Sequence, residues 1–206
     1  MGRDEKVILV ESWADPVVGW NPLETHEESP YPVVQELLSI FHHCLWRDAW
    51  GPRLEEVLRM TLLALAAVGL TLLEATLFLS VSEFRRAVLR HVDIPEVREF
   101  WSLRFERLSP SQRSLFVEPV LNKVGIFHDP AIRCLIGQQH STLDLDRALE
   151  DGQTIIANFP SGRLHGSNHL LAALLVAKFK GAVYRRPQDA RTYAVFLDEF
   201  QEMIGW

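Results

Sequence analysis

The pattern of this chain is dominated by one long helical stretch that separates two short strand signals. Val7–Val10 and Thr154–Phe159 are continuous apolar runs, which predict buried strands. Between them, residues 32–150 carry helix signals throughout. A crossover between neighbouring parallel strands can be as short as about a dozen residues. The sequence therefore predicts that the helical stretch is an inserted all-α subdomain rather than a crossover.

The residues after the helical stretch predict a βαβ unit. Thr154–Phe159 is followed by a long apolar helical pattern that ends in basic residues, and then by the apolar run Tyr193–Leu197. This order is typical of parallel strands joined by a right-handed crossover. The predicted fold class is α/β. Residues 1–29 and 151–206 are expected to form the core around the sheet, and residues 30–150 the all-α insertion.

Several helix starts are signalled locally. Pro52 suits the first turn of a helix. Ser109, Asp129 and Asp144 each precede a helical pattern and can accept a hydrogen bond from a free backbone amide. Ser80, with a glutamate three residues later, has the spacing of a capping box. We expect a helix to begin at each of these positions.

Composition limits the function classes. The 206 residues are 48% hydrophobic and 23% charged, with a formal net charge of −6, so a generally basic, nucleic-acid-coating surface is excluded. The two cysteines, Cys44 and Cys134, are far apart and imply no disulfide framework. The most apolar stretch, Met60–Leu79, contains Glu74 and several threonines, which favours a buried helix over a membrane span.

A pair of acidic residues, Asp198 and Glu199, directly follows the apolar run Tyr193–Leu197. In an open parallel sheet, ligands bind beyond the carboxyl ends of the strands. Phosphoryl chemistry needs a carboxylate that holds Mg²⁺ and a second group that orients the attacking water. We assign Asp198 to the metal, through water, and Glu199 to the catalytic water. The alternative is a strand followed by a solvated acidic turn.

The order of these segments resembles the HerA/FtsK class of P-loop ATPases, in particular the TraG/TraD-like coupling proteins of conjugation and type IV secretion. The resemblance covers nearly the whole chain, although no single motif is decisive. It is carried by VILVES with the Asn21-Pro22-Leu23 loop, by Trp50–Leu65, Phe84–Trp101, Pro119–Gln138 and Asp151–Gly166, and by YAVFLDEFQEM at the end.

The resemblance implies a partial parallel P-loop ATPase sheet with a large inserted all-α subdomain, in which Tyr193–Phe200 is the Walker B strand. The parent would be a homo-hexameric motor that couples ATP hydrolysis, with Mg²⁺, to DNA transfer. Its partners would be DNA and DNA-processing or secretion proteins. A cytoplasmic location is implied, with any membrane attachment carried by a segment outside this chain.

The sequence departs from the family pattern because it contains no GxxxxGK[ST] phosphate-binding loop. In the family that loop precedes the strand that Val7–Val10 resembles. The chain is therefore expected to be an internal fragment that carries the hydrolysis carboxylates. By itself it is expected to bind no cofactor and to hydrolyse no ATP.

Two further groups of residues have competing interpretations. Arg85, Arg86 and Arg90 could contact DNA or a partner protein, or could belong to a solvated face paired with glutamates. Ser161-Gly162-Arg163 follows a predicted strand and could approach a nucleotide or a neighbouring subunit, or could simply connect two elements. Adjacent side chains on a helix diverge, so His42-His43-Cys44 does not predict a zinc site.

Two alternatives to the fragment of a motor remain open. One is a non-catalytic helical interaction module that derives from such an ATPase and binds DNA-processing proteins. The other is an unrelated α/β protein whose acidic turn is accidental.

Overall fold

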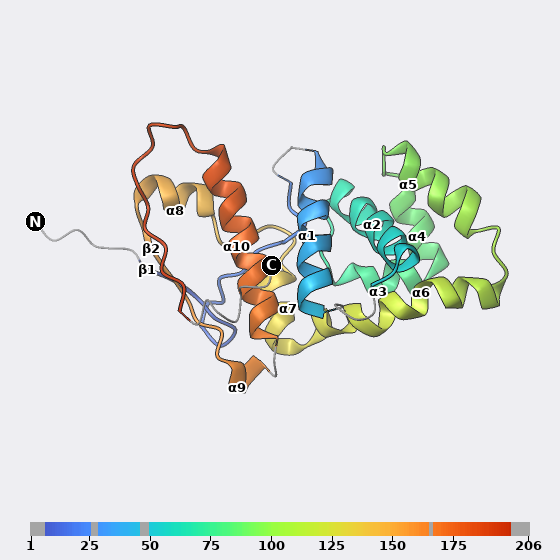
Figure 1. Cartoon of the computed structure of the whole chain (residues 1–206), viewed down its shortest axis with the longest axis horizontal. Helices are drawn as coiled ribbons and strands as arrows, with labels where there is room; N and C mark the ends of the chain where they lie inside the picture. Colours follow the sequence, from blue (N-terminus) through green and yellow to red (C-terminus); the bar gives the residue numbers. More distant parts are fainter. Residues whose placement is uncertain (1–6, 26–28, 46–49, 165–166, 199–206) are drawn as a thin grey trace, which may run out of the picture.

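The computed structural model describes residues 7–25, 29–45, 50–164 and 167–198. Helices make up 62% of the structure, and the sheet that the model describes has two strands. The predicted α/β fold class, a partial P-loop ATPase sheet with an inserted subdomain, is therefore wrong. The helices form most of the body, and the strands lie at one end of it (Figure 1).

The two strands that do form are β1 (Val7–Val10) and β2 (Thr154–Ala157), where the apolar runs predicted strands. The predicted burial is wrong, because most of their residues are exposed or partly exposed. They pair in parallel, with Val7 opposite Thr154 and Val10 opposite Ala157. Their pairing brings together segments that the whole helical stretch separates in sequence. Parallel pairing places both carboxyl ends at the same edge of the sheet.

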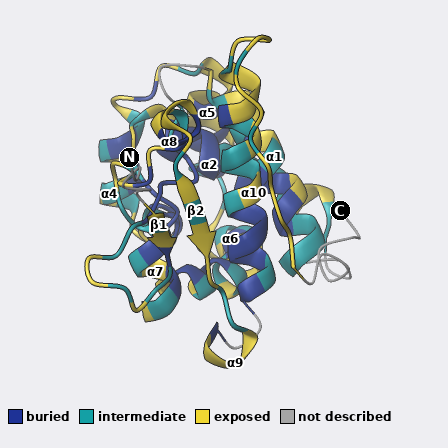
Figure 2. Cartoon of the chain, turned by 90° about the vertical axis from the view of Figure 1, so that its left-hand side faces the viewer, coloured by how far each residue is buried: buried dark blue, intermediate teal, exposed yellow. Residues whose placement is uncertain are grey.

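The predicted third strand is absent from the described part of the chain. Residues 191–197 have no strand assignment, although they are apolar. Val195 and Leu197 are about half exposed and Phe196 is 92% exposed, so the segment does not bury the faces of a central strand. A strand requires a hydrogen-bonded neighbour as well as an apolar run. Here the run passes beside β2 without joining it (Figures 1 and 2).

The helices follow the chain in an order that the local signals partly predicted. Pro52 and Asp129 stand at the starts of helices, Asp144 caps another, and Ser109 forms a capping box with Gln112. Ser80 instead ends a helix, so the capping box predicted there is wrong. The α-helices are α1 (Pro30–Leu45), α2 (Pro52–Ala67), α3 (Glu74–Ser80), α4 (Ser82–Leu89), α5 (Pro95–Glu99), α6 (Pro110–Val124), α7 (Pro130–Ile136), α8 (Leu145–Asp151), α9 (Ser161–Leu164) and α10 (Asn168–Arg185).

Two short helices of other types complete this series. A π-helix spans Phe100–Phe105 directly after α5, and a 3₁₀ helix spans Gly125–His128 directly after α6. The π-helix has its aromatic residues buried. Among the described residues, no helix is both long enough and apolar enough to cross a membrane.

The hydrophobic core is one continuous cluster of buried side chains that extends from Val10 in β1 to Ala182 in α10. It therefore includes residues of both parts that the sequence assigned to separate domains. Helix α2 lies near its centre, because most of its apolar residues are buried, including Leu54, Leu58 and Leu62 at helical spacing. It packs against α1, α3 and α6, while α1 also packs against α10. The largest fully buried side chains include Trp20, Phe41 and Trp101.

The loop that follows β1 is fixed to the helical part by its own backbone. The amide of Trp20 donates to the carbonyl of Leu135 at 2.7 Å, and the amides of Thr142 and Leu143 both donate to the carbonyl of Gly19. A Cβ atom on Gly19 would lie 2.3 Å from the carbonyl oxygen of Leu135. The close approach of these two backbones therefore requires glycine at position 19.

Gly19→Ala should lower the free energy of unfolding by about 2 kcal/mol or more, because the new methyl group has to displace backbone rather than a mobile side chain. Gly125→Ala is the matched control. Gly125 has helical angles, and a Cβ atom there meets nothing within 4 Å. That variant should be neutral or stabilised by up to about 1 kcal/mol. Urea unfolding of the three proteins measures the difference, and equal effects of the two substitutions would contradict the close approach.

Candidate functional site

The candidate site begins at the carboxyl ends of the two strands. Glu11 directly follows β1 and Asn158 directly follows β2, and the Asn158 side-chain amide donates to Glu11 Oε2 at 3.0 Å. The backbone amide of Asn158 also donates to the carbonyl of Val10, which extends the ladder by one bond. The parallel register therefore brings two polar side chains to one edge, as a parallel sheet is expected to do.

The segment that carries the predicted acidic pair runs along β2 and is anchored at its start. The Tyr193 hydroxyl donates to the carbonyl of Gln153 at 2.6 Å, and its ring lies 5.9 Å from that of Phe179 in α10. After this anchor the chain passes through the exposed residues Val195 and Phe196 to Asp198. The segment is thus tied near the amino end of β2 and extends toward its carboxyl end (Figure 1).

A cavity of about 520 Å³ lies between β2, α10 and this segment. Its walls are mostly apolar, and they include Ile155, Phe179 and Leu197. Polar side chains line it as well, namely Asn158, Asn168, His169, Tyr193 and Asp198. Asn168 begins α10, and its buried Oδ1 atom has no hydrogen-bond partner in the described part of the chain. The cavity is therefore largely apolar and is also lined by polar side chains from the end of β2, from α10 and from the segment after α10.

Of the predicted acidic pair, the structure describes only Asp198. Its side chain is exposed and lines the cavity. Glu199, the predicted catalytic residue, lies outside the described residues. Within the described ranges, no group of three or more histidine, cysteine or acidic side chains could hold a metal ion. A Mg²⁺ ion that is bound mainly through water and substrate phosphates needs only one or two carboxylates, so a single aspartate remains compatible with it.

The three predicted partner-contacting arginines lie in two different environments. Arg85 is 3% exposed and belongs to the core. Its guanidinium donates to the carbonyls of Phe78 and Leu79 and to Glu106, and it lies over the Trp101 and Phe105 rings. The interpretation of Arg85 as a surface contact is therefore corrected: its donors connect α4 with α3 and with Glu106, which directly follows the π-helix.

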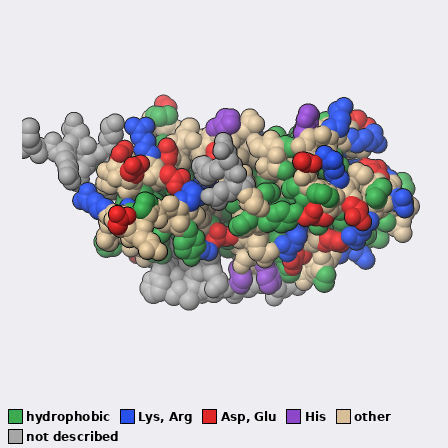
Figure 3. All heavy atoms as spheres, turned by 90° about the horizontal axis from the view of Figure 1, so that it is seen from above, with side chains coloured by type: hydrophobic (Ala, Val, Ile, Leu, Met, Phe, Trp, Pro, Cys, Tyr) green, Lys and Arg blue, Asp and Glu red, His purple; other side chains and the backbone are tan. Residues whose placement is uncertain are grey.

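Arg86 and Arg90, in contrast, are exposed on and just after α4. They line a shallow depression together with Glu83, Leu89, Arg98 and Ser102. Lysine, arginine and acidic side chains alternate over the helical end of the molecule (Figure 3). The depression beside α4 is therefore locally basic, although charges of both signs surround it. It shares no residue with the cavity beside β2.

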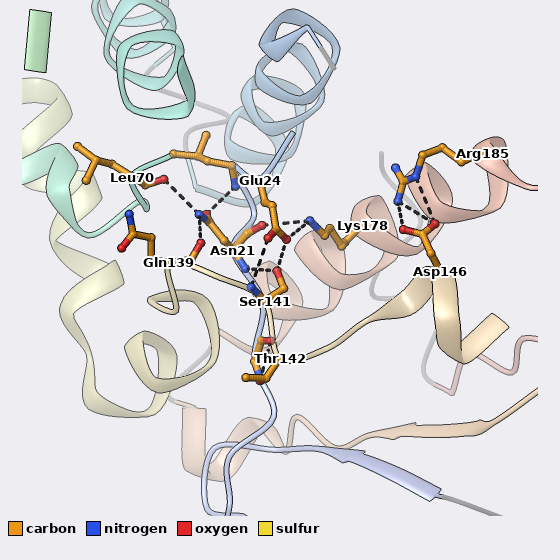
Figure 4. Close-up of polar contacts among 11 residues, drawn as sticks. Asn21, Glu24, Leu70, Gln139, Ser141, Thr142, Asp146, Lys178 and Arg185 are labelled. Carbon is orange, nitrogen blue, oxygen red and sulfur yellow. Dashed lines mark hydrogen bonds and ion pairs between the residues drawn. The ribbon is translucent and has the colours of Figure 1, made fainter. Parts of the chain in front are cut away.

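A polar network that sequence reasoning missed joins the loop after β1 to the rest of the molecule (Figure 4). Asn21 is 1% exposed, and its side-chain amide donates to the carbonyls of Leu70 and Gln139, both at 3.2 Å. Its Oδ1 accepts from the amide of Leu23 at 2.9 Å. The NH2 group and the Oδ1 atom of Asn21 therefore both have hydrogen-bond partners within the protein, as a buried amide requires.

The same loop is tied to α10 by a largely buried ion pair. Lys178 Nζ lies 3.0 Å from Glu24 Oε2, with the two side chains 10% and 21% exposed. Ser141 also donates to Glu24, through both its hydroxyl and its backbone amide (Figure 4). The one available signal in the sequence was a lysine in the middle of the apolar pattern of α10.

Burial and hydrogen bonding act in opposite directions on this pair. Burial is the largest influence on Glu24 and would raise its pKa, but the bonds from Ser141 and Lys178, with the lysine charge, hold the pKa below its usual range. For Lys178, burial lowers the pKa, and the contact with Glu24 offsets this only in part. The Glu24 carboxylate is thus stabilised in its charged form, whereas burial disfavours the charged form of the Lys178 ammonium.

Comparison with known proteins adds no relative. No family model, curated protein or solved structure matches this chain. The candidate site is therefore defined by the geometry described above and by the order of motifs in the sequence.

Glu24→Gln should lower the free energy of unfolding by about 1–3 kcal/mol near neutral pH, because it leaves the Lys178 ammonium buried beside a neutral amide. Lys178→Met should cost less, since it removes the buried charge and keeps an apolar stem. Glu36→Gln is the control. Glu36, in α1, pairs with Lys180, which follows Lys178 by two residues in α10, but both of these side chains are substantially exposed. Its effect should be within about 0.5 kcal/mol.

The pH dependence of stability gives an independent check. Since the folded pKa of Glu24 is lowered, its stabilising contribution is complete above the ordinary glutamate range and is lost as pH falls through the folded pKa. Urea unfolding at a series of acidic pH values should show a shallower loss for Glu24→Gln than for the unaltered protein. Parallel pH profiles would contradict the assignment.

Proposed function

We propose that this chain is part of a DNA-translocating ATPase of the kind that the HerA/FtsK class represents, and that it contributes the acidic pair Asp198–Glu199. The observation that carries the proposal is the parallel register of β1 and β2. It gives the chain a carboxyl edge, and Asp198 lines the cavity beside that edge. Ligands of open parallel sheets bind beyond such an edge.

In this proposal Asp198 holds Mg²⁺ through water, and Glu199 orients the water that attacks the terminal phosphate of ATP. Bound Mg²⁺ would supply the positive charge that neutralises the transferring phosphoryl group. A phosphate-binding loop is missing from the sequence, so the ATP cradle has to come from other residues of the parent protein. A complete parallel sheet would have supported the ATPase proposal, but the described part of the chain is mostly helical and has two strands.

The remaining parts of the proposal concern partners and location. The parent would be a homo-hexamer that acts on DNA together with DNA-processing or secretion proteins, in the cytoplasm. The net charge of −6 agrees with a motor in which only local arginine clusters meet DNA.

A second candidate function is a non-catalytic helical interaction module that binds DNA-processing proteins. It is favoured by the predominance of helices and by the exposed depression that Arg86 and Arg90 line. The two functions differ in whether Asp198 and Glu199 affect any activity.

The 206-residue chain alone should show no submicromolar ATP binding and no ATP hydrolysis, because it has no loop to hold the phosphates. A polypeptide that joins it to a phosphate-binding loop encoded in the same reading frame should hydrolyse ATP. In that polypeptide Asp198→Asn or Glu199→Gln should lower kcat by roughly two orders of magnitude or more. Isothermal titration calorimetry and a phosphate-release assay provide the two measurements.

Asp189→Asn is the matched control, since Asp189 is an exposed aspartate in the stretch that leads to Tyr193. Its kcat should remain within about twofold of the unaltered protein, since surface substitutions away from a site have small effects. Tight ATP binding by the chain alone would contradict the fragment interpretation. Hydrolysis that is indifferent to Asp198→Asn and Glu199→Gln would contradict the roles of the acidic pair.

If the depression beside α4 contacts the DNA backbone, Arg86→Gln combined with Arg90→Gln should weaken binding of duplex DNA and flatten its salt dependence. Each lost phosphate contact should reduce the slope of log K against log salt by about 1. Fluorescence anisotropy with a labelled duplex at several salt concentrations measures this. Arg191→Gln, which removes an exposed arginine after α10, should leave the slope unchanged. Equal slopes for all three proteins would exclude this surface.

A further inference from the structure

The carboxyl ends of β1 and β2 are connected by a second contact besides the one between Glu11 and Asn158. The Arg163 guanidinium, in the short helix α9 after β2, lies 4.7 Å from the centroid of the Trp13 ring after β1. Helix α9 projects at the foot of the molecule, below the carboxyl end of β2 (Figure 2). An arginine and an aromatic ring from two neighbouring strand exits therefore stack at the edge where the ligand of a parallel sheet is expected.

The loop that carries Trp13, the ring under Arg163, is itself bonded to α7. Ser12, the residue before Trp13, donates from its hydroxyl to the carbonyl of Ala131 at 2.5 Å, and its own carbonyl accepts from the Cys134 thiol. Both partners belong to α7. On the other side, the amide of Arg163 donates to the carbonyl of Pro160 at 3.1 Å. The backbone segments that carry the ring and the guanidinium are thus held by separate elements. The contact between the two side chains lowers the conformational freedom that a surface arginine loses when it binds a ligand.

The charge of Arg163 is not balanced by an acid in the described part of the chain, where it makes no ion pair. Glu11, the acid that directly follows β1, accepts from the Asn158 amide instead. A guanidinium that stacks on a ring by its face keeps its N–H donors in the plane of the group, where they can reach a second partner. The arrangement therefore presents a cation over the Trp13 ring whose side-chain donors have no hydrogen-bond partner among the described residues.

We propose that Arg163, positioned by Trp13, contacts a phosphate group at the carboxyl edge of β1 and β2. The planar fork of donors on arginine matches the geometry of phosphate oxygens, and charge-assisted bonds of this kind are the stronger hydrogen bonds of proteins. The choice of phosphate as the ligand rests on the proposed ATPase function. The phosphate can belong to a nucleotide or to the DNA backbone, and the experiment separates these two sources.

The test uses the 206-residue chain and three probes: inorganic tripolyphosphate, MgATP and a labelled oligothymidine. Arg163→Gln should weaken binding of tripolyphosphate by about tenfold, the loss expected when one charge-assisted contact is removed. Trp13→Leu, which keeps the arginine and removes its platform, should weaken binding by a smaller factor. Arg147→Gln is the matched control. It removes the same charge from an exposed arginine in α8, the helix that precedes β2.

A loss specific to Arg163→Gln supports the proposal, and the probe that shares this loss, MgATP or oligothymidine, identifies the source of the phosphate. Equal losses for Arg163→Gln and Arg147→Gln would mean general attraction by surface charge and would overturn it, as would no measurable binding of any probe. Because these measurements involve no hydrolysis, they can fail while the Asp198 and Glu199 variants still abolish ATPase activity, and the reverse holds as well.

Discussion

The buried amide of Asn21 is the contact on which the arrangement of this molecule most depends. It lies in the loop between β1 and α1, and it bonds to the backbone of two loops that are distant in sequence, at Leu70 and at Gln139. Loops carry backbone groups that must be paired when they are buried. The amide meets this requirement for three segments at once. It thereby sets where β1 leaves the sheet and where α1 enters the helical body.

The position of α10, and with it the candidate site, follows from the same loop. Lys178 reaches from α10 to Glu24 and to the carbonyl of Asn21, so the helix is fixed to the loop near its middle. Further along, Arg185 forms a two-pronged contact with Asp146 at the start of α8. These contacts fix one wall of the cavity beside β2 (Figure 4). The separation between α10 and β2 is therefore determined by polar contacts as well as by apolar packing.

The sequence predicted the features that depend on near neighbours and failed on those that depend on distant ones. The start at Pro52 and the capping by Asp129 and Asp144 were correct, because a cap bonds to a backbone amide within three residues. The parallel strands β1 and β2 were also found. The run Tyr193–Leu197 looked equally strand-like, yet a strand exists only where a neighbour accepts its bonds, and an apolar pattern contains no information on that neighbour.

The same limit explains the side chains that were misjudged or missed. Arg85 and Arg86 are adjacent and chemically identical, but one turns into a core of aromatic rings and the other faces water. The ring of Trp101, which decides this, comes from another helix. Glu24 and Lys178 are more than a hundred residues apart and pair only because α10 folds back onto the loop after β1. Of the candidate site, the sequence located Asp198 and the strand exits, whereas the cavity required the fold.

The two-stranded sheet has a consequence for the behaviour of the protein in solution. Alternate residues of a strand face opposite sides, and on the outer side Val7, Leu9 and Ile156 are 39–54% exposed (Figure 2). The ring of Phe196, in the segment that runs along β2, is 92% exposed as well, so this end of the molecule presents several apolar side chains to water. Attraction between such surfaces weakens on cooling. Any contact between copies of the chain through these aliphatic groups should therefore weaken on cooling and respond little to ionic strength.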